Sequence, residues 1–209
     1  MSNEFDARAT TMKRIGVFGG AFDPPHVAHR ALVQAALAEL PLDELRVVPT
    51  GQAWHKSRPL TPAYHRLAMA QLAFADLPLV VIDPTETLRP GPSYTADTLR
   101  EFKALWPDAE LFLLLGQDQA QALPTWHEWQ EILRLATICV AARADSNGAG
   151  AEPVLEKVPG FGFQRLPMPS MPVSATDIRT RIAAHLSVAD MVFEPVARYI
   201  ALHHLYQTP

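Results

Sequence analysis

Residues 15–29 read IGVFGGAFDPPHVAH. The stretch starts in an apolar strand expected at residues 14–18, continues through a glycine turn and a loop fixed by two prolines, and ends where a helix begins. Because Gly19 and Gly20 have no side chains, a phosphate chain can approach their backbone N–H groups. The following helix adds its unpaired N–H groups and the positive end of its dipole. The segment therefore predicts an α/β fold with an anion site after the first strand.

Apolar runs alternate with stretches of helical period along the rest of the chain. We expect strands at 14–18, 44–49, 79–82, 110–115, 137–141 and about 162–166, and helices at 29–40, 62–75, 94–106 and 126–134, with two short helices at the end. This alternation is typical of a doubly wound parallel sheet, here with a small C-terminal helical portion. Ligands of such sheets bind where the strands end, so residues just after the strands are the candidates for function.

Length, charge and cysteine content limit the remaining classes. The 209 residues are enough for one domain, expected at 13–207 after a flexible tail at 1–12, with a surface loop at 145–159. A net charge of −4 argues against a protein that coats nucleic acid. The sequence has neither an apolar run of the roughly 20 residues that span a bilayer nor a signal-peptide centre, so we expect a cytoplasmic protein without a membrane partner. The single cysteine, Cys139, lies in an apolar run and is interpreted as a buried hydrophobe.

His26 and His29 are three residues apart, so a helix that begins at or before His26 would place both on one face. Two imidazoles there could stabilise negative charge that develops on a phosphoryl group. A pair of histidines at this spacing also occurs in metal sites, but the accompanying His-Glu-x-x-His helix is not found in this sequence.

Residues 172–179 read PVSATDIR and form the second candidate motif. Ser174 and Asp177 fit a helix-capping pattern, which by itself indicates a capped helix with a solvated arginine. The same residues also present hydroxyls, N–H groups and the guanidinium of Arg179 to one anion. Residues alone leave both interpretations open.

The two motifs together resemble those of the nucleotidylyltransferase superfamily. Residues 19–29 are similar to its Gly-Gly-Thr-Phe-Asp-Pro-x-His-x-Gly-His signature, with alanine at 21 and 28 in place of threonine and glycine, and residues 174–179 are similar to its Ser-x-Thr-x-x-Arg motif. The resemblance implies a Rossmann-like nucleotidyltransferase fold, with ATP as a substrate and Mg²⁺ held through its phosphates instead of by protein ligands. It implies catalytic roles for His26, His29 and Arg179. The ATP-binding residues that it implies are Gly19, Gly20, Ala21, Phe22, Ala28, Gly116, Asp118, Ser174 and Thr176.

Two further segments, PSYT at 92–95 and PTW at 124–126, resemble the bacterial nicotinate-mononucleotide adenylyltransferases. The resemblance implies that Trp126 stacks on the nicotinate ring and that Tyr94 and Thr95 lie near its carboxylate. It also implies that His55, Lys56 and Arg143 contact the phosphate of the mononucleotide. Taken alone, Trp126 is an apolar helix anchor and the three cations are solvated surface groups.

The implied reaction joins ATP to nicotinate mononucleotide and yields nicotinate adenine dinucleotide and pyrophosphate, a step of NAD biosynthesis. Three alternatives stay open: another phosphorylated acceptor such as nicotinamide mononucleotide or pantetheine phosphate, a cytidylyl transfer, or a catalytically silent nucleotide sensor. The sequence also leaves open whether the chain forms a homo-oligomer.

Overall fold

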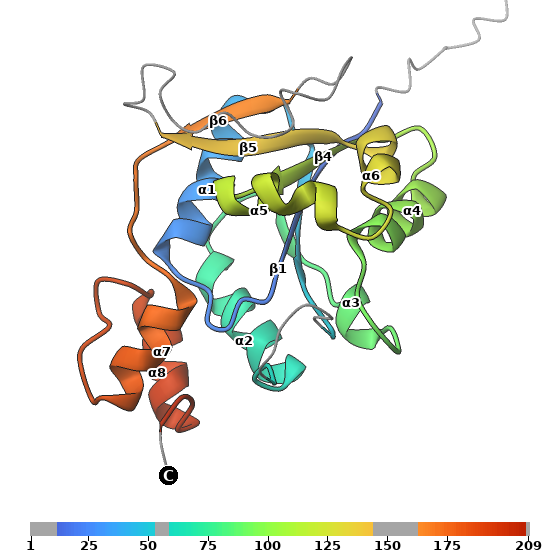
Figure 1. Cartoon of the computed structure of the whole chain (residues 1–209). Coiled ribbons are helices and arrows are strands. Elements are labelled where there is room, and N and C mark those ends of the chain that lie inside the picture. Colours follow the sequence, from blue (N-terminus) through green and yellow to red (C-terminus); the bar gives the residue numbers. More distant parts are fainter. Residues whose placement is uncertain (1–11, 53–58, 144–162, 208–209) are drawn as a thin grey trace, which may run out of the picture.

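The computed structural model describes residues 12–52, 59–143 and 163–207 (Figure 1). Within these ranges six parallel strands form one sheet in the order β3-β2-β1-β4-β5-β6. The strands are β1 (Arg14–Gly20), β2 (Glu44–Pro49), β3 (Val80–Ile82), β4 (Glu110–Leu115), β5 (Thr137–Arg143) and β6 (Gln164–Met168). The strand order reverses between β1 and β4, so a crevice is expected where these two neighbours end.

Helices cover both faces of the sheet, and in Figure 1 α5 lies in front of the strands while α1 lies behind them. The helices are α1 (Val27–Glu39), α2 (Ala63–Phe74), α3 (Thr85–Leu88), α4 (Thr95–Leu105), α5 (Gln117–Ala122), α6 (Trp129–Leu135), α7 (Ala175–Ala183) and α8 (Glu194–Leu202), with a 3-10 turn η1 at Leu123–Thr125. Among the described residues, no helix has both the length and the apolar character to cross a bilayer.

Side-chain alternation along the strands produces two cores, one on each face. Phe112 and Leu114 of β4 pack with apolar residues of α1, α2, α7 and α8. Leu111, Leu113 and Leu115 point to the other face, where they pack with α4, α5 and α6. Because both faces of the central strands are covered, β4 is an almost continuous apolar run. The doubly wound parallel sheet with a C-terminal helical portion is therefore confirmed.

Several expected boundaries were wrong, including those of the last strand, expected at about 162–166 and observed at Gln164–Met168. β1 continues two residues beyond Phe18, because Gly19 and Gly20 still pair with β2, so the glycines end a strand instead of forming a turn. The helix expected at 126–134 begins only at Trp129, after η1 and a left-handed residue, Glu128, at φ 50°. The helix expected to start at residue 29 begins at Val27. The predicted loop at 145–159 and the first eleven residues of the predicted tail lie outside the described residues.

Candidate active site

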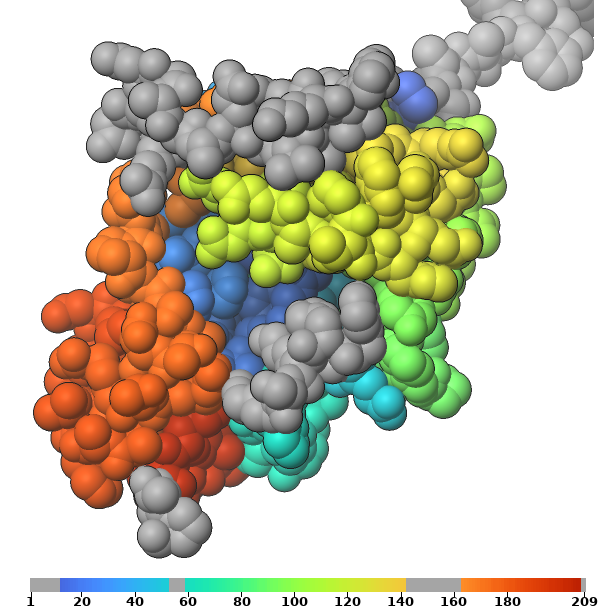
Figure 2. Space-filling model, in the orientation of Figure 1, coloured from blue at the N-terminus to red at the C-terminus, as the bar shows by residue number. Residues whose placement is uncertain are grey.

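A cavity of about 680 Å³ opens where β1 and β4 end. Its walls come from the loop after β1, from α1, from the first residues of α4, α5 and α7, and from the turn around Trp126. Figure 2 shows the hollow between the yellow-green α5 and the orange C-terminal segment, with blue N-terminal residues at its floor. Most of the predicted site residues line it: Gly19, Gly20, Ala21, Phe22, His26, Ala28, His29, Tyr94, Thr95, Gly116, Asp118, Trp126 and Arg179.

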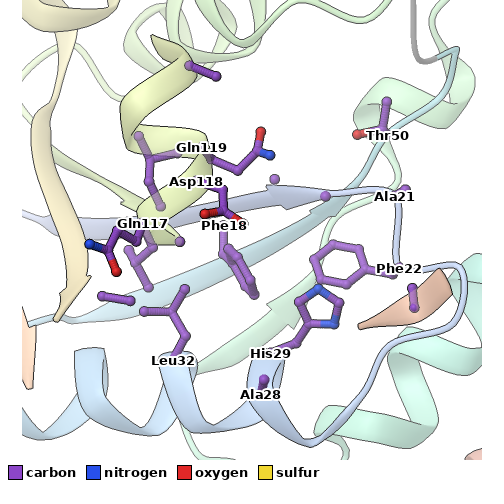
Figure 3. A pocket seen from close by; sticks show the side chains of 18 of the residues that line it. Phe18, Ala21, Phe22, Ala28, His29, Leu32, Thr50, Gln117, Asp118 and Gln119 are labelled. Carbon is purple, nitrogen blue, oxygen red and sulfur yellow. The ribbon is translucent and has the colours of Figure 1, made fainter. Parts of the chain in front are cut away.

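The two histidines lie together at the start of α1. His26 is the N-cap residue, and its backbone N–H donates to Nδ1 of His29 at 3.2 Å. Their rings stack with centroids 3.7 Å apart and planes inclined by 23°. Since Nδ1 of His29 accepts this bond, a neutral His29 carries its proton on Nε2 and donates hydrogen bonds from that nitrogen. In Figure 3, His29 lies beside Phe22, whose ring centroid is 5.1 Å away.

His26 is a buried polar group of the site. Its side chain is 7% exposed, and its Nδ1 is buried without a hydrogen-bond partner among the described residues. Burial lowers the pKa of His26 to about 4, because the charged imidazolium would lose its hydration. His26 is therefore neutral at pH 7, and the stacked pair avoids a repulsion between two positive charges.

Arg179 joins the C-terminal motif to the loop after β1. Its Nη1 donates to the backbone carbonyl of Asp23 at 2.8 Å, and its Nη2 donates to Oγ1 of Thr176 at 3.0 Å. Asp23 and Arg179 are 156 residues apart in sequence. The expectation that both motifs meet at one cleft is what the structure shows, since His26, His29 and Arg179 line the same cavity.

Ser174 and Thr176 do not line the cavity in the described structure. Oγ of Ser174 accepts from the backbone N–H of Asp177 at 3.1 Å and donates to Oδ2 of the same residue at 2.6 Å. The helix-cap interpretation therefore holds for Ser174, while Thr176 supports Arg179. Their predicted contacts to phosphate stay a prediction.

Gly19 and Gly116 leave the cavity wall open. A Cβ atom at either position would meet no atom within 4 Å, so a ligand can approach the backbone there. At Gly20, a Cβ would lie 3.1 Å from the ring of Phe22, so packing within the protein also favours glycine. Gly116 is the N-cap of α5, and Asp118 stands in its first turn (Figure 3). A carboxylate next to an open glycine wall suits the hydroxyl groups of a ribose.

Aromatic residues and the start of α4 also line the cavity. Tyr94 is the N-cap of α4, and its ring lies 4.3 Å from that of His127. Trp126 is half-buried and packs against the buried cluster that includes Ala120 of α5 and Ile132 of α6. Thr95, the first residue of α4, lines the same cavity. His55 and Lys56 lie outside the described residues, and of Arg143 only the backbone is described, at the end of β5.

Sequence reasoning missed Glu86 and Thr50, which also line the cavity. Glu86 is buried, and its Oε1 accepts from the hydroxyl of Thr98 at 2.8 Å. Burial raises its pKa, opposed mainly by this bond and by the charge of Arg89. Glu86 stands in a four-residue helix, which leaves no periodicity to mark it. Asp23, inside the first quoted stretch, and His127, directly after the PTW segment, also line the cavity and were not selected.

Comparisons with known proteins identify the family of this chain. The cytidylyltransferase-like family model matches residues 17–181. Relatives named "probable nicotinate-nucleotide adenylyltransferase" include one from Albidiferax ferrireducens, 78% identical and covering 94% of this chain and 100% of its own length. Another, from Methylibium petroleiphilum, is 45% identical and covers 96% of both chains.

Among solved structures, the nicotinic acid mononucleotide adenylyltransferase of Plasmodium falciparum complexed with NaAD has a TM-score of 0.75 at 22% identity, covering 93% of this chain and 97% of that one. At this identity the likeness supports the fold, and the closer relatives supply the family. The chain therefore belongs to the cytidylyltransferase-like family and, within it, to the nicotinate-nucleotide adenylyltransferases.

Proposed function

We propose that this chain transfers the adenylyl group of ATP to nicotinate mononucleotide, releasing pyrophosphate and forming nicotinate adenine dinucleotide for NAD biosynthesis. One observation carries the proposal: a single cavity is lined by the histidine pair and Arg179, by open glycines next to Asp118, and by the aromatic residues Tyr94 and Trp126. The family names of relatives up to 78% identical support it.

In this reaction a phosphate oxygen of the mononucleotide attacks the α-phosphorus of ATP. The bond between that phosphorus and the bridging oxygen to the β-phosphate breaks, and the electron pair leaves with pyrophosphate. The enzyme needs no covalent intermediate, because alignment and charge stabilisation account for most catalysis in such transfers. His29 offers a donor from Nε2, and Arg179 offers a permanent positive charge.

His26 contributes in its neutral form. With a pKa of about 4, it acts near pH 7 as a hydrogen-bonding imidazole and not as a cation. The positive potential near His26 then comes from Arg179 and from the N-terminal end of α1, where His26 is the N-cap. A bound triphosphate would raise the pKa of His26, because nearby negative charge favours the protonated ring.

The resemblance implies Mg²⁺ as the metal that accompanies ATP, and the cavity suits a metal carried by the nucleotide. Both carboxylate oxygens of Asp23 accept hydrogen bonds, from Tyr206 and Thr61, and Glu86 is bonded to Thr98. Within the described ranges, no three His, Cys, Asp or Glu side chains converge as a metal cage. When bound through phosphates and water, Mg²⁺ would neutralise charge on the triphosphate.

The aromatic lining is suited to a pyridine ring that bears an acid. Trp126 provides a flat apolar face, and Tyr94 and Thr95 bring the start of α4 to the wall of the same cavity. N–H groups and the positive dipole end at a helix start favour a carboxylate over a neutral amide. The structure thus favours nicotinate over nicotinamide mononucleotide, while the roles of His55, Lys56 and Arg143 stay predictions.

Pyrophosphate release from ATP or CTP, measured with a panel of acceptors, tests the proposal. The panel contains nicotinate mononucleotide, nicotinamide mononucleotide and pantetheine phosphate. We expect the highest kcat/KM for ATP with nicotinate mononucleotide. A higher kcat/KM with another acceptor, or with CTP in place of ATP, would show that the proposed substrates are wrong. Tight ATP binding without pyrophosphate from any acceptor would establish the silent sensor, for which Ala21 and Ala28 in the cavity wall are the motivating departures.

A further inference from the structure

Arg66 is a fully buried cation that no sequence pattern marks as functional. Its side chain is 1% exposed, and it is not among the cavity-lining residues of the described structure. The guanidinium donates to three backbone carbonyls: those of Thr61 at 2.7 Å, Ala21 at 2.9 Å and Gly51 at 3.3 Å. One side chain of α2 thus ties together the loops after β1 and β2 and the segment before its own helix.

Packing alone does not account for an arginine at this position. Burial of a guanidinium is unfavourable, and apolar residues of similar volume often stabilise a core at least as well. Burial lowers the pKa of Arg66, and the charge of Asp23 opposes this most strongly. What arginine adds is a planar set of donors that a lysine or a methionine lacks.

Asp23 is the second centre of this network. It is 1% exposed, and its Oδ1 accepts from the hydroxyl of Tyr206 at 2.7 Å, while its Oδ2 accepts from the backbone N–H of Thr61 at 3.3 Å. Its backbone carbonyl is the acceptor for Arg179. Tyr206 lies 183 residues further along the chain, so the C-terminal end is fixed directly to the loop that precedes the histidines.

The residue between Ala21 and Asp23 has an unfavourable backbone conformation. Phe22 has φ 48°, in the left-handed region, which costs a non-glycine residue on the order of 1 kcal/mol. Its buried ring packs edge-on against Phe18 and His29. Arg66 holds the carbonyl before Phe22, and the Asp23 contacts hold the residue after it. A loosened loop would therefore displace the surface on which His29 rests.

We propose that Arg66 and Tyr206 are positioning residues for adenylyl transfer. They act through the carbonyl of Ala21 and through Asp23 to hold His29 and Arg179 in the geometry that the transition state needs. This inference rests on the proposed function for its rate measurement, but the loop geometry that it describes can be measured without turnover.

The test compares Tyr206→Phe and Arg66→Lys with two matched controls. Tyr199→Phe removes a hydroxyl that bonds Nδ1 of His65 at 3.0 Å, and Arg30→Lys alters an arginine that bonds Asp76 and the carbonyl of Ala73. Both controls lie outside the cavity lining in the described structure. For each variant kcat, both KM values and the melting temperature are measured with the best acceptor of the wild-type protein.

We expect kcat to fall about tenfold in Tyr206→Phe and about a hundredfold in Arg66→Lys, with both KM values within about twofold of wild type. Tyr199→Phe and Arg30→Lys should keep the wild-type kcat, even if their melting temperatures fall as much as those of Tyr206→Phe and Arg66→Lys. An unchanged kcat in Tyr206→Phe, or losses in all four variants that follow melting temperature, would overturn the proposal. If Arg66→Lys does not fold, Tyr206→Phe decides.

Amide hydrogen exchange separates this proposal from the proposed function. Exchange of residues 19–26, without substrates, should be faster in Tyr206→Phe than in both wild type and Tyr199→Phe. If the wild-type protein shows no turnover with any acceptor, the proposed reaction fails and faster exchange still supports the positioning role. Unchanged exchange would refute that role regardless of activity.

Discussion

Because His26 is buried in its neutral form, the stability of the fold depends on pH. Its pKa of about 4 in the folded protein lies below the ordinary value of 6.5, so the unfolded chain takes up the proton first as the pH falls. The fold therefore keeps its full stability above pH 6.5 and loses part of it between pH 6.5 and 4. Two and a half pKa units correspond to about 3 kcal/mol at most.

Urea unfolding of wild type and His26→Gln at pH 7, 6, 5 and 4 measures this contribution. From pH 7 to pH 4, the fall in the free energy of unfolding should be about 2 to 3 kcal/mol smaller for His26→Gln than for wild type, because glutamine does not titrate. Subtracting one curve from the other cancels the contributions of other titrating groups. One such group is Asp76, whose pKa is lowered to about 2 by its bonds to Arg30. Parallel curves for both proteins would show that His26 titrates normally.

Gly116 tests the glycine wall of the cavity. Its φ of −68° suits alanine, and an added methyl would meet no protein atom within 4 Å. Gly116→Ala should lower stability by only about 0.5 to 1 kcal/mol, because alanine is a poorer N-cap residue than glycine, while the methyl extends into the proposed nucleotide site and raises KM for ATP about tenfold. Gly51→Ala is the contrasting variant, since its Cβ would overlap the carbonyl oxygen of Glu86 and should destabilise the fold. An unchanged KM for ATP in Gly116→Ala would place the nucleotide elsewhere.

At the scale of elements, the start of α7 decides between the two interpretations of Ser174. Ser174→Ala should cost about 1 kcal/mol of stability through the lost cap. Ser174→Asp and Ser174→Asn should both restore the cap, but only aspartate adds a charge that repels a triphosphate. We expect KM for ATP to rise in Ser174→Asp and not in Ser174→Asn. Equal KM values in the two variants would leave Ser174 as a cap alone.

The sequence predicted long elements well and short ones poorly. Strands such as β4 are recognisable because burial on both faces requires an unbroken apolar run. Helices α3 and α5, with 4 and 6 residues, were missed because so short a helix shows no period. The helix after Trp126 was placed too early because the left-handed Glu128 has no local signature.

Site residues that stand in recognisable motifs could be predicted from the sequence, and those that act through long-range contacts could not. His26, His29 and Arg179 stand in motifs whose spacing is visible in the sequence, and they line one cavity as expected. Arg66 and Tyr206 were missed because their roles depend on contacts across the fold. In sequence Arg66 is one cation on an apolar-faced helix, and only folding places the three carbonyls around it.

At the scale of the whole molecule, the C-terminal helices share a core with the N-terminal half. Val196 and Ile200 of α8 pack in the same buried cluster as Leu32 of α1 and Met69 of α2. The bond from Tyr206 to Asp23 adds a polar link between the same parts. Residues 13–207 should therefore unfold as one domain, with no separate transition for α7 and α8.

The positions of the tryptophans make this expectation testable. Of the four tryptophans, Trp106, Trp126 and Trp129 pack on the sheet face opposite to α8, and none of the four belongs to the C-terminal helices. Ile200→Ala should remove about 2 to 4 kcal/mol of stability. Tryptophan fluorescence should nevertheless report the same shifted urea midpoint as far-UV circular dichroism, since the two cores unfold together. A fluorescence midpoint equal to that of wild type, with an earlier transition in circular dichroism, would instead make the C-terminal helices an independently unfolding unit.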